Sequence, residues 1–490
     1  MKYRVVFYLL VLAVSLVEAE DFDETEACVH RHSLTCNMTH IHEDTPRNVR
    51  SISQMFAQGI FYNRLRLNSF GYAWKEELGT DSARSIRKNH AITAVGASVI
   101  YRSAYFYGFS VGLSLYTSQA WGSLSQDEVA LYKGGKDTFS RYDVVHRDSR
   151  YTLASLAESY VEYSYAKSHI KLGRQIFESF LTKSNDTKMI PNTFEGITLQ
   201  SKILSNTSIK MAYLQKQKLR DHNRFHHVLA FEEDYSQNDD SAMHRGLSLS
   251  VLDSLGIEDK LLIMELQNAS VENLTLYANY TAVPRLISSA MLQVGYRMHL
   301  NDWSIVPTVR YMQQFDEGAG AIAGANHLTL NTGYIHPNSL NSQMYAGRID
   351  VVNDAFKLRF GYTHIVDKGD IIAPWRGFPT GGFSRAMSQY NWYANTKSYM
   401  LQMDYECQVI PHLKFISRFV VQDFDDNKIG VQSDANLFSF DILKILDNKK
   451  LYLKTRYAHV VGDGDTITSY GNPKLDPSYD ELRFEINYLF

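Results

Sequence analysis

The sequence predicts an all-β protein: a transmembrane antiparallel up-and-down β-barrel of about eighteen strands, with short periplasmic turns and long external loops. Three observations support this prediction. Apolar and polar residues alternate with a period of two from about residue 60 onward. The connections between these segments are alternately tight turns and long polar insertions. The chain ends on an amphipathic strand. A period of two is typical of strands that have one apolar and one polar face.

The composition excludes several other classes of protein. The chain has 490 residues and a net charge of −3, and its aromatic share of 13% excludes intrinsic disorder. With only 28 Gly and 10 Pro it is not collagen-like, and the near-neutral charge gives no reason to expect nucleic acid as a partner. A mean hydropathy of −0.28 argues against a bundle of membrane helices. The 32 Tyr and 25 Phe require a large apolar surface.

The first element in the chain is a predicted secretory signal peptide, residues 1–19. Lys2 and Arg4 form a basic head, an apolar run continues to Leu16, and Ala19 ends a small-residue cleavage site. A single membrane anchor is the alternative, but the apolar run is too short to cross a bilayer comfortably. We therefore expect a mature chain that is exported through the periplasm.

Residues 20–58 are predicted to form a periplasmic tail rich in cysteine and histidine. Cys28 and Cys36 are candidates for a small disulfide loop, which leaves Cys407 single. The weaker alternative is a metal site, because four histidines lie close together, although their spacing fits no zinc-finger template. These histidines are His30, His32, His40 and His42. We expect a disulfide-tied, solvated tail without a bound metal.

Residues 59–490 are predicted to form the barrel. The run from Phe106 to Leu115 alternates most clearly, with Tyr107 and Phe109 on the apolar face and Gly108 on the polar face. Strands are expected to begin near residues 60, 91, 106, 152, 168, 193, 207, 260, 273, 288, 303, 342, 355, 397, 412, 434, 450 and 480. Long insertions are expected after Trp74, Gln119, Phe177, Lys216, Val283, Phe315, Lys368, Asp423 and Gly462.

The last strand ends on an aromatic residue. Leu482, Phe484, Ile486, Tyr488 and Phe490 share one face, which resembles the signal that bacterial outer-membrane barrels present to the barrel-assembly machinery. Aromatic residues near strand ends are expected to form girdles at the two membrane interfaces. They include Tyr101, Tyr107, Tyr163, Tyr165, Tyr296, Tyr311, Tyr405, Tyr457 and Tyr488.

The polar phase of the strands is predicted to line the lumen, and cations outnumber anions in it. The predicted inward cations are Arg64, Arg66, Arg102, Lys171, Lys202, Lys210, Lys216, Arg297, Arg310, Arg348, Lys357, Arg359, Lys414, Arg418, Lys454, Arg456 and Arg483. The predicted inward anions are Glu158, Glu162, Asp350, Asp404, Glu406 and Glu485. Such a wall attracts anionic groups, whereas any single arginine could equally serve a structural cross-strand pair.

Several segments resemble the OprD-type outer-membrane porins. They are Lys171-Leu-Gly-Arg-Gln175, the run 185–196, Tyr345-Ala-Gly-Arg-Ile-Asp350 and Leu65-Arg-Leu-Asn68. The resemblance implies a monomeric eighteen-stranded barrel with inward-folded loops and a ladder of basic residues. It also implies a substrate-preferring channel for small solutes that bear a carboxylate, including amino acids. Arg174 lies in the motif but out of phase with Lys171, which indicates a bulge or a structural role.

Two loops are candidates for a constriction. The resemblance places the main constriction in the insertion 178–192, with Asp186 and Lys188 at or near the narrowest point. The loop from Lys368 to Thr396 is rich in turn formers and carries Arg376 and Arg385, and we expect it to fold into the mouth of the barrel.

The sequence contains no known catalytic motif and no cofactor motif. The predicted function is therefore passive diffusion of small anionic or zwitterionic solutes through an outer-membrane porin. A non-conducting adhesin or structural barrel and, less favoured, a barrel enzyme are the alternatives. The other expected partners are the lipid bilayer and its lipopolysaccharide.

Overall fold

The computed structural model describes residues 34–35, 39–41, 46–78, 87–146, 151–184, 189–230, 247–325, 331–387, 389–446 and 450–490. Some of the predicted features lie outside these residues. They are the signal peptide, Cys28, Cys36, His30, His32, His42, Asp186 and Lys188.

The described strands belong to one sheet of 21 members, of which three are only two or three residues long and the other 18 form the wall. The first wall strands are β2 (Ile60–Trp74), β3 (His90–Arg102), β5 (Phe109–Gly122), β6 (Thr152–Tyr165), β7 (Ser168–Gln175), β8 (Thr193–Ser201), β9 (Thr207–Lys218), β10 (Leu261–Asn268) and β11 (Leu274–Val283). They are followed by β12 (Ile287–Tyr296), β14 (Trp303–Asp316), β15 (Ser342–Val352), β16 (Phe356–Ile365), β17 (Lys397–Glu406), β18 (Leu413–Asp423), β19 (Ala435–Leu446), β20 (Leu451–Gly462) and β21 (Tyr479–Leu489).

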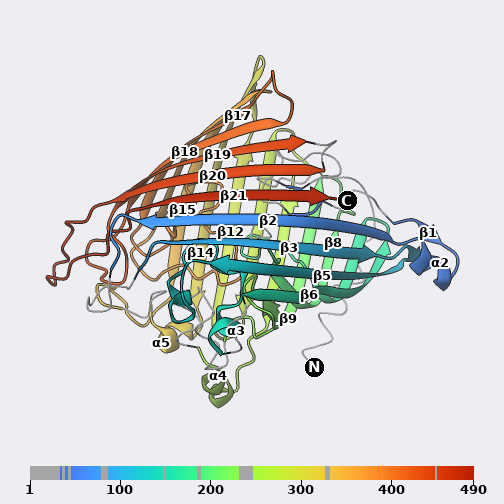
Figure 1. Cartoon of the computed structure of the whole chain (residues 1–490), viewed down its shortest axis with the longest axis horizontal. Coiled ribbons are helices and arrows are strands. Elements are labelled where there is room, and N and C mark those ends of the chain that lie inside the picture. Colours follow the sequence, from blue (N-terminus) through green and yellow to red (C-terminus); the bar gives the residue numbers. More distant parts are fainter. Residues whose placement is uncertain are drawn as a thin grey trace.

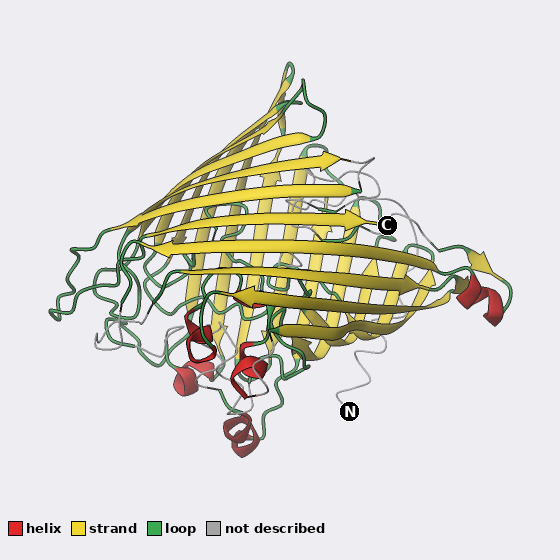
Figure 2. Cartoon of the chain, in the orientation of Figure 1, coloured by secondary structure: helices red, strands yellow, loops and turns green. Residues whose placement is uncertain are grey.

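The short strands and the helices lie at the two ends of the wall. The short strands are β1 (Asn48–Val49), β4 (Tyr105–Phe106) and β13 (Met298–Leu300). The helices are α2 (Ile52–Ala57), α3 (Arg141–His146), α4 (Leu249–Leu255) and α5 (Ala319–Ala323), with 3-10 helices at Gln126–Leu131 and Lys136–Thr138. Figure 2 shows α3, α4 and α5 among the loops at one end of the molecule and α2 at the other. None of the helices in the described residues has the length and hydropathy needed to cross a membrane.

The wall closes on itself. Each wall strand pairs antiparallel with the next one along the chain, and β21 pairs with β2, so that Arg64 lies opposite Leu489 and Trp74 opposite Tyr479. Figure 1 shows β21 in red beside β2 in blue, with the other strands curving behind them. Closure leaves the wall with no unpaired edge, which is a requirement for a sheet in a bilayer.

The two faces of the wall differ in the way the alternation predicts. Along β2, exposed Leu65 alternates with buried Arg64 and Arg66, and the same pattern continues around the barrel. Exposed apolar residues on the outer face include Val95, Val99, Leu113, Leu115, Val161, Leu172, Val309, Ile349, Phe360, Leu401, Phe419, Phe438 and Leu482. The prediction of an antiparallel barrel with an apolar outer face and a polar inner face is confirmed.

Strand starts agree with the prediction to within three residues, and the largest difference has a clear cause. β5 begins at Phe109 rather than at residue 106, because Tyr107 (φ +50°) and Gly108 (φ +83°) form the tight turn between β4 and β5. Two consecutive positive φ angles give the turn type whose twist matches a hairpin. The prediction of a long insertion after Val283 is also wrong, because only three residues separate it from β12.

Candidate functional site

The loop between β16 and β17 lies against the inner face of the wall. Arg310 of β14 donates through Nη1 to the carbonyl oxygens of Pro379 (2.9 Å) and Gly381 (3.0 Å). Arg348 of β15 and Arg359 of β16 both donate to the carbonyl oxygen of Gly382, over 2.9 and 2.8 Å. These arginines alternate with exposed apolar residues and therefore point inward, so the loop lies inside the barrel.

An acidic and an aromatic side chain complete this contact. Asp350 accepts two hydrogen bonds from Arg359, at 2.6 and 3.1 Å, and lies 3.2 Å from Nε of Arg348. The Phe383 ring of the loop packs under the guanidinium groups of Arg310 (4.5 Å) and Arg348 (5.1 Å). Charge-assisted hydrogen bonds of this kind are about twice as strong as neutral ones. Three of the predicted pore-lining arginines therefore anchor a loop.

The loop between β7 and β8 meets the first loop inside the barrel. The Lys183 amide donates to the carbonyl oxygen of Trp375 (3.2 Å), and the Gly377 amide donates to that of Leu181 (2.9 Å). A Cβ at Gly377 would lie 2.3 Å from the Leu181 backbone, so only glycine permits this approach. Arg66 of β2 donates to the carbonyl oxygen of Met189 (3.1 Å) in the same loop. The two loops thus form one partition attached to opposite parts of the wall.

Of the two arginines predicted for the loop between β16 and β17, one contacts the loop between β9 and β10 and the other contacts its own loop. Arg376, 7% exposed, donates to Asp221 Oδ1 over 3.3 Å. Arg385 donates to the carbonyl oxygen of Gln389, and its guanidinium lies 4.5 Å from the ring centroid of Phe378. Both guanidinium groups therefore hold loop segments in place.

A second group of inward cations lies on the wall from β18 to β21. Asp441 of β19 lies 3.4 Å from Arg418 of β18 and 3.2 Å from Arg456 of β20. Arg456 stands directly opposite Arg483 of β21 in the strand register, and Arg483 pairs with Glu481 at 2.7 Å. We call Arg418, Arg456 and Arg483 the basic row. The side chains of Arg418 and Arg456 keep 19% and 15% of their surface exposed, and that of Arg483 keeps 10%.

A third group lies on β6 and β7. Lys171 is 3.4 Å from Glu162 and lies over the Tyr160 ring at 4.4 Å. Arg174 pairs with Glu195 of β8 at 3.3 Å on the other face, and the pairing of β7 with β8 stays regular through it. Arg174 therefore has a structural role, and no bulge in β7 is needed to explain its phase.

Several other predicted cations differ in their surroundings. Arg64 and Arg66 face inward but are fully buried, Lys357 is half-buried, Lys202 lies in the turn after β8, and Arg297 is exposed after β12. Lys216, predicted to point inward, is exposed. A bulge between β8 and β9, where Glu195 pairs with Lys216 and Gly196 with Leu214, reverses the phase before Lys216.

The sequence pattern also missed three inward acids, Glu265, Asp441 and Glu481. Glu265 lies 3.4 Å from Lys210, and the other two hold the basic row. The phase of β19 is hard to assign because Leu437 and Leu443, on the same face as Asp441, are as apolar as the outer face. The excess of inward cations is therefore smaller than the sequence indicates.

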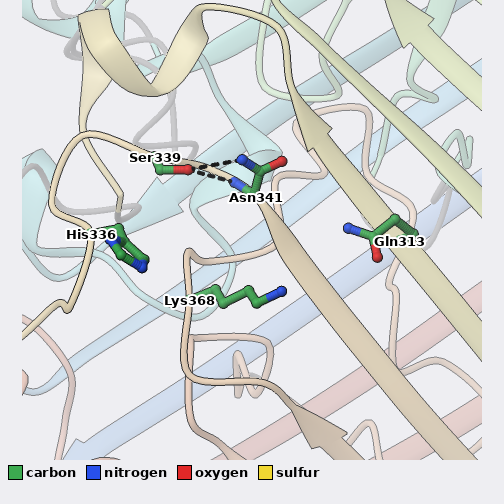
Figure 3. Close-up of a pocket in the computed structure, with 5 residues that line it drawn as sticks. All are labelled: Gln313, His336, Ser339, Asn341 and Lys368. Carbon is green, nitrogen blue, oxygen red and sulfur yellow. Dashed lines mark hydrogen bonds between the residues drawn. The ribbon is translucent and has the colours of Figure 1, made fainter.

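A separate cavity of about 260 Å³ lies at the loop end of β14 (Figure 3). Gln313, His336, Ser339, Asn341 and Lys368 line it. Gln313 shares its phase with the exposed Val309 and Tyr311, so this cavity opens on the outer side of the wall and is not part of the lumen. In the described part of the chain no three His, Cys, Asp or Glu side chains are grouped to hold a metal ion; of the four candidate histidines, this part includes only His40.

Comparison with known proteins places this barrel in a family. A family model described as outer membrane porin, OprD family, matches residues 81–421. The structure resembles Acinetobacter baumannii OccAB2 (TM-score 0.66, 16% identity) and Pseudomonas aeruginosa OpdK solved with vanillate (TM-score 0.64, 13% identity). Each match covers 89% of this chain and 99% of the other. No functionally curated protein matches the sequence. The chain belongs to the OprD family of outer-membrane porins, as its motifs and its closed 18-stranded wall indicate.

Proposed function

We propose that this porin lets small carboxylate-bearing solutes, including amino acids, diffuse passively through its lumen, with no catalytic step. The observation that carries the proposal is the basic row, in which Arg456 and Arg483 face each other across neighbouring strands. Like charges directly opposite one another destabilise a sheet, and here Asp441, Glu481 and Glu485 offset them. A solute anion that passes the row relieves this repulsion.

The chemistry of the row suits brief binding. A guanidinium group can hold a carboxylate through two parallel hydrogen bonds, and the partial exposure of Arg418 and Arg456 leaves room for such contacts. Asp441 competes with the solute for both arginines, so each solute contact stays weak. Weak successive sites are what conduction requires, because a tightly bound solute does not leave. The OpdK neighbour carries vanillate, whose name denotes a carboxylate, which supports the same solute class for this chain.

The partners we propose follow from the same reading. The chain would work as a monomer in a bilayer containing lipopolysaccharide, and the strand that ends at Phe490 would be read by the barrel-assembly machinery. Phe490 is exposed and stacks on Tyr488 at 6.2 Å, so the terminal aromatic pair is accessible on the outer face. A non-conducting barrel or a barrel enzyme remains the alternative outcome of the test below.

The test is a planar-bilayer recording under a salt gradient, followed by liposome uptake of carboxylates, amino acids and neutral sugars. We expect single-channel steps, a reversal potential of anion-preferring sign and faster uptake of carboxylates than of sugars. The variant Arg456→Gln with Arg483→Gln should move the reversal potential toward that of a non-selective pore. Arg174→Gln removes one charge from the outer face and is the control. Absence of channel steps, or a reversal potential unchanged in the double variant, would refute the proposal.

Charge reversal at Arg310 and Arg359 is a poor test of selectivity. Both side chains hold the loop between β16 and β17 through its carbonyl groups, so their loss would alter the width of the lumen together with its charge. The basic row is a better test, because its arginines pair with Asp441 and Glu481, which belong to the wall strands β19 and β21.

A further inference from the structure

The inner wall carries an apolar patch where a water-filled lumen would be expected to be polar. Leu443 and Ile445 of β19, Tyr452 of β20 and Leu489 of β21 form one cluster near the turn between β19 and β20. Leu443 and Ile445 alternate with outward residues and share the phase of Asp441, so they point into the lumen. Apolar side chains in a wet lumen are unfavourable unless something covers them.

A segment from the N-terminal tail covers this patch. Leu34 belongs to the same cluster and is only 1% exposed. The Thr35 amide donates to the carbonyl oxygen of Thr39 (2.9 Å), and Leu34 forms an antiparallel bridge with His40. A solvated tail was expected here, and Leu34 does not fit that expectation, since water-exposed leucine beside an apolar patch is less favourable than contact between the two.

The described tail residues also reach the partition. The Thr39 hydroxyl lies 3.5 Å from the Ser184 hydroxyl in the loop between β7 and β8. The chain is held again outside the wall, where the Tyr105 amide donates to the carbonyl oxygen of Arg47 (2.8 Å) and β1 pairs with β4. Figure 1 shows β1 and α2 beyond the end of the wall at which β2 begins. Residues 34–35 and 39–41 therefore lie in the lumen between the turn end and the partition.

We propose that residues 34–35 and 39–41 form a tethered plug that narrows the periplasmic half of the lumen and sets its conductance. This inference rests on the channel function proposed above. Leu34 holds the plug in place by packing against the apolar patch. The wall does not need the segment to close, because its strands pair from β2 to β21 without it. The plug can therefore leave the patch while the barrel stays folded.

The first test asks whether the segment lies in the lumen. In a background in which all three native cysteines are serine, Leu34→Cys is combined with Ile445→Cys on the inner face or with Phe438→Cys on the outer face of the same strand. A short bismaleimide applied to outer membranes should crosslink the first pair and not the second. The product is read on a gel and does not depend on conduction. The proposal is overturned if the inner pair does not crosslink, or if it crosslinks no more than the outer pair.

The second test measures conductance. Leu34→Asp places a charge against the patch and should raise the single-channel conductance by roughly 1.5-fold or more, whereas Leu34→Met should leave it unchanged. The variant with Leu34→Cys and Ile445→Cys should show low conductance when crosslinked, and a higher conductance when it is prepared without the crosslinker. Unchanged conductance in Leu34→Asp overturns the plug while the channel function stands. If the inner pair crosslinks but no variant shows channel steps, the result counts against the channel function. The position of the segment in the lumen would still be established by the crosslink.

Discussion

Substitution of Gly361 is expected to detach the lumen loop from the wall. Gly361 lies in the middle of β16, and a Cβ added there would sit 1.9 Å from the carbonyl oxygen of Phe383. Ordinary contact begins near 3.4 Å, so Gly361→Ala requires the loop to move by roughly 1.5 Å. That displacement takes the Gly382 carbonyl beyond hydrogen-bond range of Arg348 and Arg359, which now donate to it over 2.9 and 2.8 Å.

The magnitude follows from these two bonds. Hydrogen bonds from a charged group contribute about 1.5–3 kcal/mol each, so the loop loses roughly 3–6 kcal/mol of its attachment while the strand ladder stays intact. We expect a larger single-channel conductance and faster uptake of larger sugars into liposomes. Gly347→Ala is the control, because a Cβ there meets nothing within 4 Å. Wild-type conductance and uptake in Gly361→Ala would show that the loop does not limit the pore.

Two further predictions concern charge. Asp441→Asn should strengthen anion preference in reversal-potential recordings, because Arg418 and Arg456 lose their shared carboxylate. For the same reason it should lower the stability of the barrel by about 3 kcal/mol in thermal unfolding. Unchanged selectivity would contradict this prediction. Burial is the largest single influence on the pKa of Asp425 and raises it, but the hydrogen bonds from Lys428, Asn395 and the Asn427 amide, together with the Lys428 charge, outweigh burial and hold the pKa below its usual value. Because the folded pKa is lowered, this stabilisation is complete above about pH 4 and is lost as the pH falls through the lowered pKa. Hydrogen exchange in the loop between β18 and β19 should therefore accelerate only in that acidic range, and in Lys428→Met it should already be fast at neutral pH.

Much of the wall could be predicted from the sequence because its physics is local. A residue such as Leu65 that meets lipid must alternate with one such as Arg66 that does not, and this pattern fixes both strand and phase. The prediction fails where the pattern is interrupted. The bulge before Lys216 reverses the phase, and the apolar inner face around Asp441 makes the two sides of β19 look alike.

The contents of the lumen were much harder to predict. Arg310 was identified as pointing inward, but its partners in the loop are the backbone carbonyl groups of Pro379 and Gly381, and a carbonyl carries no side-chain signature. The same holds for Gly361, whose importance comes from a loop that crosses in front of it. Leu34 lies in a tail whose composition is typical of solvated chain, and its partner Tyr452 is more than four hundred positions away.

The ladder between β2 and β21 has a consequence for how this molecule comes into being. Its two strands lie at the beginning and the end of the wall, so the seam can be sealed only when the complete polypeptide is present. Until then every intermediate has two strand edges whose backbone N–H and C=O groups are unpaired, and an apolar surface that is exposed to water. Loss of even the last strand would leave a curled, open sheet, which we expect to be degraded in the periplasm and never to reach the bilayer.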